Sequence, residues 1–269
     1  SQKRLHEADA WLQEHGWRAE WLETGGPGDA TGMAARAAER GVPLVFVCGG
    51  DGTLNEAANG LAGSETALVV IPGGTTNLWA REAGLCKKPR EAVRLAVEGD
   101  RRRIDLGRAG SRYFVLMAGY GLDASVVHRV STRAKRRLGA AAYAFGAVRE
   151  MLTFHGTHMR MNFDGETTAS DVLMIVVGNT RGYAGLTQIT PDALADDGLL
   201  DVCVYQGRGR MDIAVHALRT LVRRHRGSRK VLYRRVARLE MDWEQPLLLQ
   251  VDGDTFPESP SEVTVAPGA

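Results

Sequence analysis

Two apolar runs, each followed at once by a glycine-rich loop, constrain the fold of this chain more than any other feature. The first run covers residues 44–48 and precedes the loop Gly49–Thr53, and the second covers residues 67–71 and precedes the loop 72–77. A continuous apolar run of this length is typical of a strand that is buried on both faces of a parallel sheet. Because helical segments are expected after both loops, the sequence predicts an α/β domain with a parallel, Rossmann-like sheet.

Two helices and a short strand are expected before the first apolar run. Apolar residues at helical spacing predict an amphipathic helix from residue 5, and the alternation of Trp17, Ala19 and Trp21 predicts a short strand. The glycine-rich turn at 25–29 precedes a second helix, expected over about 30–40 and ended by Gly41.

The pattern changes after about residue 104. Strands separated by turns are expected over 113–117, 157–163, 170–177, 200–205 and 247–251. Only two helices are expected there, over 124 to about 153 and over 211–225. The sequence therefore predicts two domains, residues 1–104 and residues 105–269, of which the second is mainly antiparallel.

Charge is distributed unevenly along the 269 residues, although the net charge is only +2. Residues 1–104 hold 13 basic and 14 acidic side chains, residues 105–240 hold 21 and 12, and the tail holds six acids and no base. A basic middle suggests an anionic partner surface, while solvated charge is the commoner explanation. No nucleic-acid partner is expected, because no DNA-binding signature or basic stripe with interleaved aromatic residues occurs.

The cysteines favour a reducing, cytoplasmic setting. Cys48, Cys86 and Cys203 are widely spaced, form no CxxC motif and cannot provide a disulfide framework. Cys48 ends an apolar run and is expected to be a packing residue. His155 and His158 form a pair without a third ligand at suitable spacing, so zinc is not expected. No apolar run approaches the ~18 residues that span a bilayer.

The first glycine-rich loop has the composition of a phosphate-binding loop. Glycine lets the backbone approach a phosphate or adopt positive φ, and the N-terminus of the following helix favours an anion. Asp51 would repel a bare phosphate, so a functional role for this residue requires Mg²⁺ or a reacting hydroxyl. The alternative is a tight turn in which Asp51 caps the helix. The second loop would face the same cleft, because it follows the neighbouring strand.

GGDGTLNE at 49–56 and IPGGTTNLWAR at 71–81 resemble the catalytic domain of diacylglycerol kinases, in the branch of soluble bacterial lipid kinases. RIDLGR (103–108), MAGYGLDASVV (117–127), PDALADDGLLDVCVY (191–205) and VDGDTFPESP (251–260) follow in the order of that family. GGDGT alone is shared with NAD kinases, and the later motifs select lipid kinases. The resemblance implies an α/β ATP-binding domain and a mainly antiparallel, β-sandwich-like lipid-binding domain, with the active site in the interdomain cleft.

The resemblance also implies ATP and Mg²⁺ as cofactors. The ATP contacts that it implies map to Thr24, Gly50, Asp51, Gly52, Thr53, Leu54, Asn55, Glu56 and Thr75. The Mg²⁺ position maps to one carboxylate and two carbonyl groups, those of Asp197, Leu194 and Leu199, and such hard oxygen donors suit this ion. The sequence at 196–198 is also typical of a hairpin turn. Asp105 maps to an acid that supports the site through a charge network, or else it only bonds a strand end.

Asp254, in the sequence Asp252-Gly253-Asp254, maps to the acid that accepts the proton of the lipid hydroxyl in this family. The family has a longer Glu there, so Asp51 is a second candidate for this catalytic role, and a plain turn is the alternative for 252–254. Two further departures concern the nucleotide domain. Nothing before Thr24 matches the Asn-Pro-x-x-Gly loop of the family, so the first strand is expected to be missing. Leu78 stands where many members have Asp.

These observations predict a phosphotransferase that acts on a lipid hydroxyl such as that of diacylglycerol, in the cytoplasm or at the inner face of the membrane. A sphingoid-type or NAD kinase-like enzyme on the same scaffold and a non-catalytic nucleotide- or lipid-binding relative are the alternatives. Basic clusters at 101–103, 133–137 and 223–230 and the apolar stripe of the helix at 211–226 fit contact with an anionic bilayer. The alternative is an ordinary surface helix that packs on a sheet and has a solvated charged face. The sequence leaves the lipid and the oligomeric state open, a homodimer included.

Overall fold

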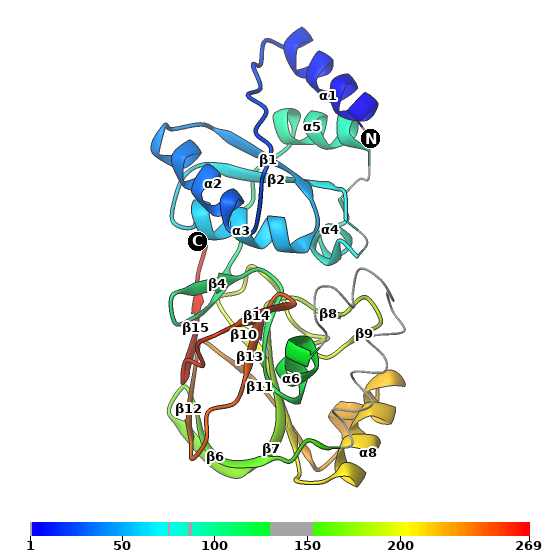
Figure 1. The fold of residues 1–269 in the computed structure, drawn as a ribbon, viewed down its shortest axis with the longest axis vertical. Helices are drawn as coiled ribbons and strands as arrows, with labels where there is room; N and C mark the ends of the chain where they lie inside the picture. Colours follow the sequence, from blue (N-terminus) through cyan, green and yellow to red (C-terminus); the bar gives the residue numbers. More distant parts are fainter. Residues whose placement is uncertain (1, 75, 86–87, 130–152) are drawn as a thin grey trace. The chain divides into compact units, whose positions relative to one another are not determined.

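The computed structural model describes residues 2–74, 76–85, 88–129 and 153–269. These residues form two compact units, residues 1–104 with 268–269 and residues 105–267 (Figure 1). The first unit combines helices with a parallel sheet, and the second is dominated by antiparallel strands. Within the described ranges, no helix combines the length and the apolar character that crossing a membrane requires.

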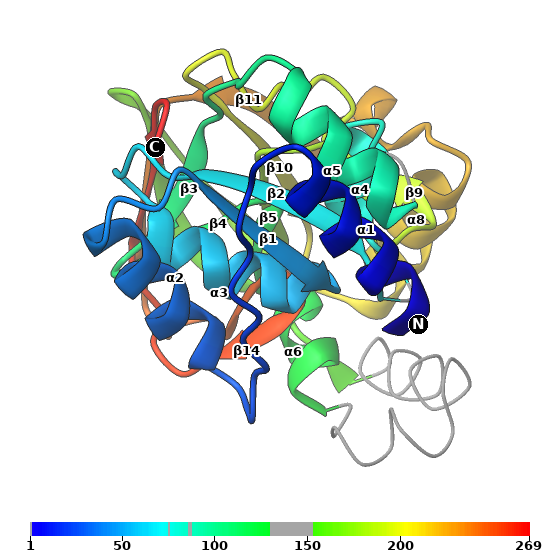
Figure 2. The ribbon, with the colours of Figure 1, turned by 90° about the horizontal axis from the view of Figure 1, so that it is seen from above.

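The sheet of the first unit pairs β1 (Leu44–Gly49) with β2 (Ala67–Pro72) in parallel, in the register Leu44 to Ala67. Figure 2 shows α2 (Asp29–Glu39) and α3 (Asp51–Leu61) on one face of this sheet and α1 (Gln2–Glu14) and α5 (Pro89–Glu98) on the other. The predicted α/β domain with a parallel sheet is therefore confirmed. A fifth, short helix, α4 (Leu78–Glu82), follows the second glycine-rich loop.

Each face of this sheet buries its own apolar cluster. Val47 packs with side chains of α2 and α3 on one face, namely Ala34, Ala57 and Leu61. Ile71 packs with side chains of α1 and α5 on the other face, namely Ala8, Trp11, Leu12, Ala92 and Val93. Burial of both faces explains why the two strands read as continuous apolar runs.

Two details of this unit differ from the sequence-based expectation. Residues 17–25 form neither helix nor strand, so the strand predicted at Trp17 to Trp21 is wrong. Trp17 instead donates its backbone N–H to Leu12 O at 2.9 Å and packs on the α1–α5 cluster, which explains the apolar residue without a strand. Cys48 is exposed and not a packing residue, because the apolar clusters cover the sheet only up to Val47 on this strand.

All described strand pairs of the second unit are antiparallel. The central strand is β7 (Glu166–Gly178), whose first half pairs with β6 (Thr157–Phe163). The second half of β7 pairs on its two edges with β5 (Met117–Gly121) and β10 (Leu200–Gln206). This confirms the prediction of a mainly antiparallel second domain.

The remaining strands extend this arrangement at both ends. They are β3 (Leu106–Ala109), β4 (Arg112–Phe114), β11 (Val231–Val236), β12 (Arg238–Trp243), β13 (Leu249–Val251), β14 (Asp254–Phe256) and β15 (Glu262–Ala266), with the small hairpin of β8 (Gly182–Tyr183) and β9 (Thr187–Gln188). Alternation along β6 buries Met159, Met161 and Phe163 in one large core. Among the described residues, two α-helices flank the strands, α6 (Leu122–Arg129) and α8 (Arg210–Leu221). Of the helix predicted from 124 to about 153, residues 130–152 lie outside the described residues.

Candidate functional site

The two glycine-rich loops of the first unit pack against each other, backbone on backbone. The N–H groups of Gly73 and Gly74 both donate to Gly49 O, at 2.9 and 3.2 Å. A Cβ atom on Gly74 would lie 2.7 Å from the Cα of Gly50, so no side chain fits at this contact. Glycine is therefore required here for close approach, and none of these loop glycines has positive φ.

Asp51 joins the same two loops through its side chain. It is the first residue of α3, and its carboxylate accepts hydrogen bonds from the backbone N–H groups of Leu78 at 3.0 Å and Trp79 at 3.2 Å. Those two groups open α4, so Asp51 caps a helix other than its own. Asn77 completes the loop, because its Oδ1 accepts from the N–H of Gly74 at 3.0 Å.

Several of the other residues predicted to contact ATP lie on α3 or directly before it. Gly50 is the N-cap of α3, and the first-turn N–H groups that follow it have no acceptor within the helix. Leu54 and Asn55 are buried. Glu56 accepts the N–H of Ala30 at 3.2 Å and so ties α3 to the start of α2.

Four more predicted positions complete the comparison for ATP. Gly52 and Thr53 occupy the first turn of α3 and are partly accessible, and Thr24 is exposed in the segment before α2. Thr75 lies outside the described residues. The structure thus gathers Gly50 to Thr53 at the carboxyl end of β1, which is where an α/β sheet binds ligands.

In the second unit, the sequence Asp252-Gly253-Asp254 forms the turn between β13 and β14. The carboxylate of Asp252 accepts three backbone hydrogen bonds of 2.8 to 2.9 Å, from the N–H groups of Val115, Leu116 and Met117. Asp252 has φ 50° and Gly253 has φ 89°, so the backbone adopts a left-handed turn. The turn is held firmly, and it leaves the Asp254 carboxylate exposed without a hydrogen bond among the described residues.

A buried carboxylate that was not among the predicted site residues supports this turn. Asp123 lies in α6, accepts the Tyr183 hydroxyl and accepts Gln250 Nε2 at 2.7 Å. Gln250 Oε1 in turn accepts the N–H of Gly253 at 2.7 Å. Burial raises the pKa of Asp123, and the two hydrogen bonds oppose that shift. The only sequence signal for a functional role of Asp123 was its place in the family motif at 117–127.

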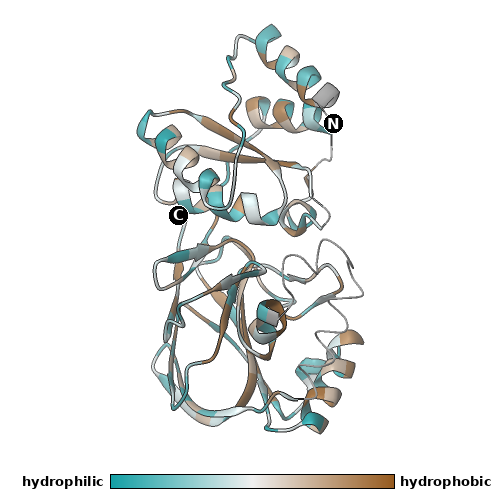
Figure 3. Ribbon diagram, in the orientation of Figure 1, coloured by the Kyte–Doolittle hydropathy of each residue, from teal (hydrophilic) through white to brown (hydrophobic). Residues whose placement is uncertain are grey.

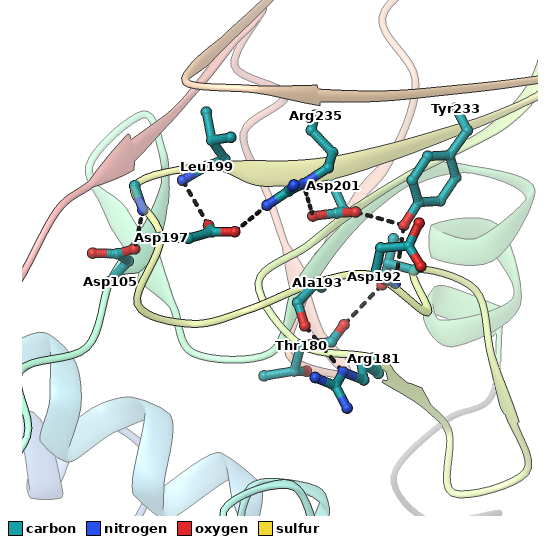
Figure 4. A network of polar contacts seen from close by, with 12 residues as sticks. Asp105, Thr180, Arg181, Asp192, Ala193, Asp197, Leu199, Asp201, Tyr233 and Arg235 are labelled. Atoms are coloured by element: carbon teal, nitrogen blue, oxygen red, sulfur yellow. Dashed lines mark hydrogen bonds and ion pairs between the residues drawn. The ribbon is translucent and has the colours of Figure 1, made fainter.

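The turn at 194–199 carries the positions predicted for Mg²⁺, and Asp105 holds this turn in place (Figure 4). The backbone N–H of Asp105 donates to Ala195 O at 2.6 Å, and its carboxylate accepts the N–H of Gly198 at 2.6 Å. Asp105 therefore bonds the turn at two points, which fits a supporting role. Asn179 fixes Asp105 from behind, since its Nδ2 donates to Asp105 O at 2.8 Å.

Asp197 shares an arginine with a second acid. One Asp197 oxygen accepts the N–H of Leu199 at 3.1 Å and the other pairs with Arg235 (Figure 4). Arg235 Nε also lies 3.5 Å from Asp201 Oδ2, and the Tyr233 hydroxyl donates to Asp201 Oδ1 at 2.5 Å. Burial raises the pKa of Asp201, and Arg235 and Tyr233 counteract that shift.

The donor types at this turn fit Mg²⁺. Leu194 and Leu199 offer carbonyl oxygens and Asp197 offers a carboxylate, and Leu194 is 42% exposed, so solvent reaches the turn. An ion here would share Asp197 with Arg235. In the described part of the chain, no group of three or more His, Cys, Asp or Glu side chains is placed to hold a metal ion, and His158 Nδ1 lies 3.0 Å from Asp171 Oδ1.

Comparison with known proteins identifies two family domains. The diacylglycerol kinase catalytic domain matches residues 1–109, and the YegS C-terminal NAD kinase beta sandwich-like domain matches residues 117–269. The second match alone covers more than half of the chain.

Individual relatives agree with the two domains. The chain is 29% identical to "Diacylglycerol kinase" of Bacillus subtilis (strain 168), over 90% of this chain and 81% of that protein. It is 31% identical to "Probable lipid kinase YegS-like" of Pseudomonas syringae pv. syringae (strain B728a), over 98% of this chain and 87% of that protein. Its fold matches the crystal structure of a diacylglycerol kinase from Bacillus anthracis str. Sterne with a TM-score of 0.78, at 23% identity over 99% of this chain and 89% of the other. The chain therefore belongs to the family of diacylglycerol kinases and YegS-like lipid kinases.

Proposed function

We propose that this protein is an ATP- and Mg²⁺-dependent lipid kinase that transfers the γ-phosphoryl group of ATP to a lipid hydroxyl such as that of diacylglycerol. The observation that carries the proposal is the pair of glycine loops packed at the carboxyl ends of β1 and β2, in a chain of the lipid kinase family. The three cysteines, without a disulfide pattern, support a cytoplasmic location.

The phosphates of ATP would lie at the start of α3. Backbone N–H groups of the first helical turn carry partial positive charge, and the glycines of both loops leave the backbone uncovered. Gly50 to Thr53 supply these groups, and Thr24, Leu54, Asn55, Glu56 and Thr75 remain predicted contacts. The carboxylate of Asp51 is already bonded to Leu78 and Trp79, which favours a role in shaping the loops over proton transfer.

Asp254 is the better candidate for the general base. Its carboxylate is exposed, while Asp252 and Gln250 hold the backbone of the two residues before it. In the proposed step, Asp254 takes the proton of the lipid hydroxyl as that oxygen bonds to the γ-phosphorus. The bond from the γ-phosphorus to the bridging oxygen breaks, and ADP leaves with the electron pair.

Leu194, Asp197 and Leu199 would hold Mg²⁺ through two carbonyl oxygens and one carboxylate. When bound, the ion supplies positive charge that offsets the charge of the phosphate groups. Asp105 keeps the turn in shape through its bonds to Ala195 and Gly198. Arg235 keeps the Asp197 carboxylate oriented.

The test is transfer of label from γ-labelled ATP to acceptors, with Mg²⁺ present or chelated. The acceptors would be diacylglycerol, a sphingoid base and other hydroxyl lipids in detergent micelles, and NAD in solution. We expect a labelled lipid, formed only with Mg²⁺. A labelled NAD without any labelled lipid would overturn the proposal in favour of a NAD kinase-like activity. No labelled product with any acceptor would favour a non-catalytic relative.

A further inference from the structure

Helix α8 exposes apolar side chains on the face that is turned away from its unit. Met211 is 78% exposed and Leu218 is 64% exposed, and Val215 and Val222 are exposed as well. These residues are spaced four, three and four apart, so they lie along one side of the helix. Figure 3 shows the hydrophobic colour on α8 at the periphery of the second unit. A solvent-facing stripe of this kind is unusual for a surface helix.

The opposite face fixes α8 to the sheet. Ile213 is buried against Leu122, Val126 and Leu173. The hydroxyl groups of Tyr205 and Thr220 lie 2.9 Å apart in a hydrogen bond. The exposed stripe is therefore presented on a firmly seated helix and does not result from a loose one.

A hairpin adds a further apolar side chain beside α8. Leu186 is 79% exposed at the connection between β8 and β9. The next residue, Thr187, donates its hydroxyl to Thr220 O at 2.9 Å and so ties the hairpin to the C-terminal half of α8. Leu186 thus widens the apolar stripe at that end.

Arginines surround this apolar surface. Residues 208–230 contain eight Lys or Arg and a single acid, Asp212, which pairs with Lys230 at 2.6 Å. Within the described part of the chain, no carboxylate forms an ion pair with the four exposed or partly exposed arginines nearest the stripe, namely Arg210, Arg219, Arg223 and Arg224. A partner that covers the stripe must therefore supply negative charge at its rim.

We infer that the exposed face of α8, with Leu186, docks the protein on an anionic lipid bilayer. The bilayer interface accepts apolar side chains below its headgroups and attracts arginines with the headgroups themselves. A second copy of the same face would instead bring arginines against arginines. The inference rests on the proposed lipid kinase function, because it names the surface that brings the enzyme to its substrate.

The test is sedimentation of the full chain with vesicles of phosphatidylcholine and phosphatidylglycerol, without ATP. Two exposed side chains are changed together, Leu218→Gln and Val222→Gln, which removes apolar character without changing charge. A second variant, Arg223→Gln with Arg224→Gln, removes charge alone. The matched control is Leu95→Gln, which alters a leucine that is 55% exposed on α5 in the first unit.

The first variant is expected to lose at least tenfold in vesicle partitioning, and the control is expected to bind as the unchanged protein does. The arginine variant should lose a similar factor at low salt and show a weaker salt dependence. Undiminished vesicle binding by either variant would overturn the inference. So would a dimer in light scattering that the first variant dissociates, because a second copy would then cover the stripe.

A second measurement separates this inference from the proposed function. Turnover of a short-chain diacylglycerol dispersed as monomers should be equal in all these proteins, while turnover of long-chain diacylglycerol in vesicles should fall only in the two α8 variants. Vesicle binding without turnover of either lipid would leave docking intact and refute the kinase proposal. Equal turnover of vesicle lipid by all variants would refute docking alone.

Discussion

The carboxylate of Asp51 accepts a hydrogen bond of 3.0 Å from the backbone N–H of Leu78. Asp51 opens α3 and Leu78 opens α4, so one side chain links the two helices that follow the glycine-rich loops. The backbone of Leu78 makes this contact, so the contact does not depend on the side chain at this position. Under the proposed function, this contact favours a structural role for Asp51 and leaves Asp254 as the candidate base.

Asp51→Ala should lower the free energy of unfolding by about 0.5–2 kcal/mol, the usual cost of losing a helix-capping side chain. Asp51→Asn should cost less, because one amide oxygen still accepts one of the two N–H groups. Urea unfolding of both variants would measure this, with Asp100→Ala as a control at an exposed acid. An Asp51→Ala protein as stable as the control would show that the cap contributes nothing.

Gly74→Ala should disrupt nucleotide binding, because its Cβ would lie 2.7 Å from the Cα of Gly50 and would push the loops apart. Gly227→Ala is the matched control, since its Cβ would meet nothing within 4 Å. Titration with an ATP analogue should show at least a tenfold weaker affinity for Gly74→Ala alone. Equal affinity in the two variants would mean that the contact between the loops does not shape the site.

The parallel sheet could be predicted because β1 and β2 are buried on both faces and carry no polar residue before their loops. The strands β11 and β12 were not predicted. Adjacent arginines, Arg234 and Arg235, break the alternation along β11, whereas charged and apolar residues do alternate along β12, a strand signal that the prediction left unused. Their pairing is decided by distant strands, which local pattern does not show. The strand predicted at Trp17 is wrong because this residue packs against α1 and α5 and not within a sheet.

Those parts of the candidate site that could be predicted were predicted from residue types and from the family motifs. The glycine loops lie at the carboxyl ends of β1 and β2, where ligands would be expected, although the glycines serve close packing and not positive φ. The roles of Asp252 and Asp123 could not be foreseen. Their partners are backbone groups and side chains more than a hundred residues away in the sequence, at Val115 and at Gln250.

Tyr183→Phe should destabilise the protein by about 1.5–3 kcal/mol at pH values where Asp123 is ionised, the usual value of a hydrogen bond to a charged group, and by less where Asp123 is protonated. Burial raises the pKa of Asp123, so its contribution to stability is present below the unfolded-state pKa and is lost as pH rises through the folded-state pKa. Without the tyrosine hydroxyl that pKa rises further, and the loss at high pH grows. Unfolding followed between about pH 4 and pH 8 would measure it.

Asp123→Asn is the control for that experiment, because it removes the titrating group. Its unfolding free energy should change less with pH than that of the unchanged protein over the same range. If Tyr183→Phe lowers stability equally at both ends of the range, the hydrogen bond is insensitive to the charge on Asp123 and the account of this network is wrong.

Arg235→Gln should destabilise the second unit, because it removes the cation beside the buried carboxylate of Asp201. Breaking a buried ion pair by removing one partner costs about 3–5 kcal/mol of unfolding free energy. The loss expected here lies at or below that range, because the contact is 3.5 Å long and the arginine is partly exposed. Asp201→Asn in the same chain should recover part of the loss. Urea unfolding of the two single variants and the double variant gives the coupling, and additive losses would show that the two residues do not interact.

The measurement that bears most directly on the proposed function is phosphoryl transfer from ATP to diacylglycerol by Asp254→Asn, compared with Asp242→Asn. Asp242 is an exposed acid on β12 of the same unit and serves as the matched control. We predict that Asp254→Asn lowers kcat by about 10²–10⁴, the usual contribution of a general base, while its KM for ATP stays within a few-fold. Transfer by Asp254→Asn at the rate of the control would contradict the account.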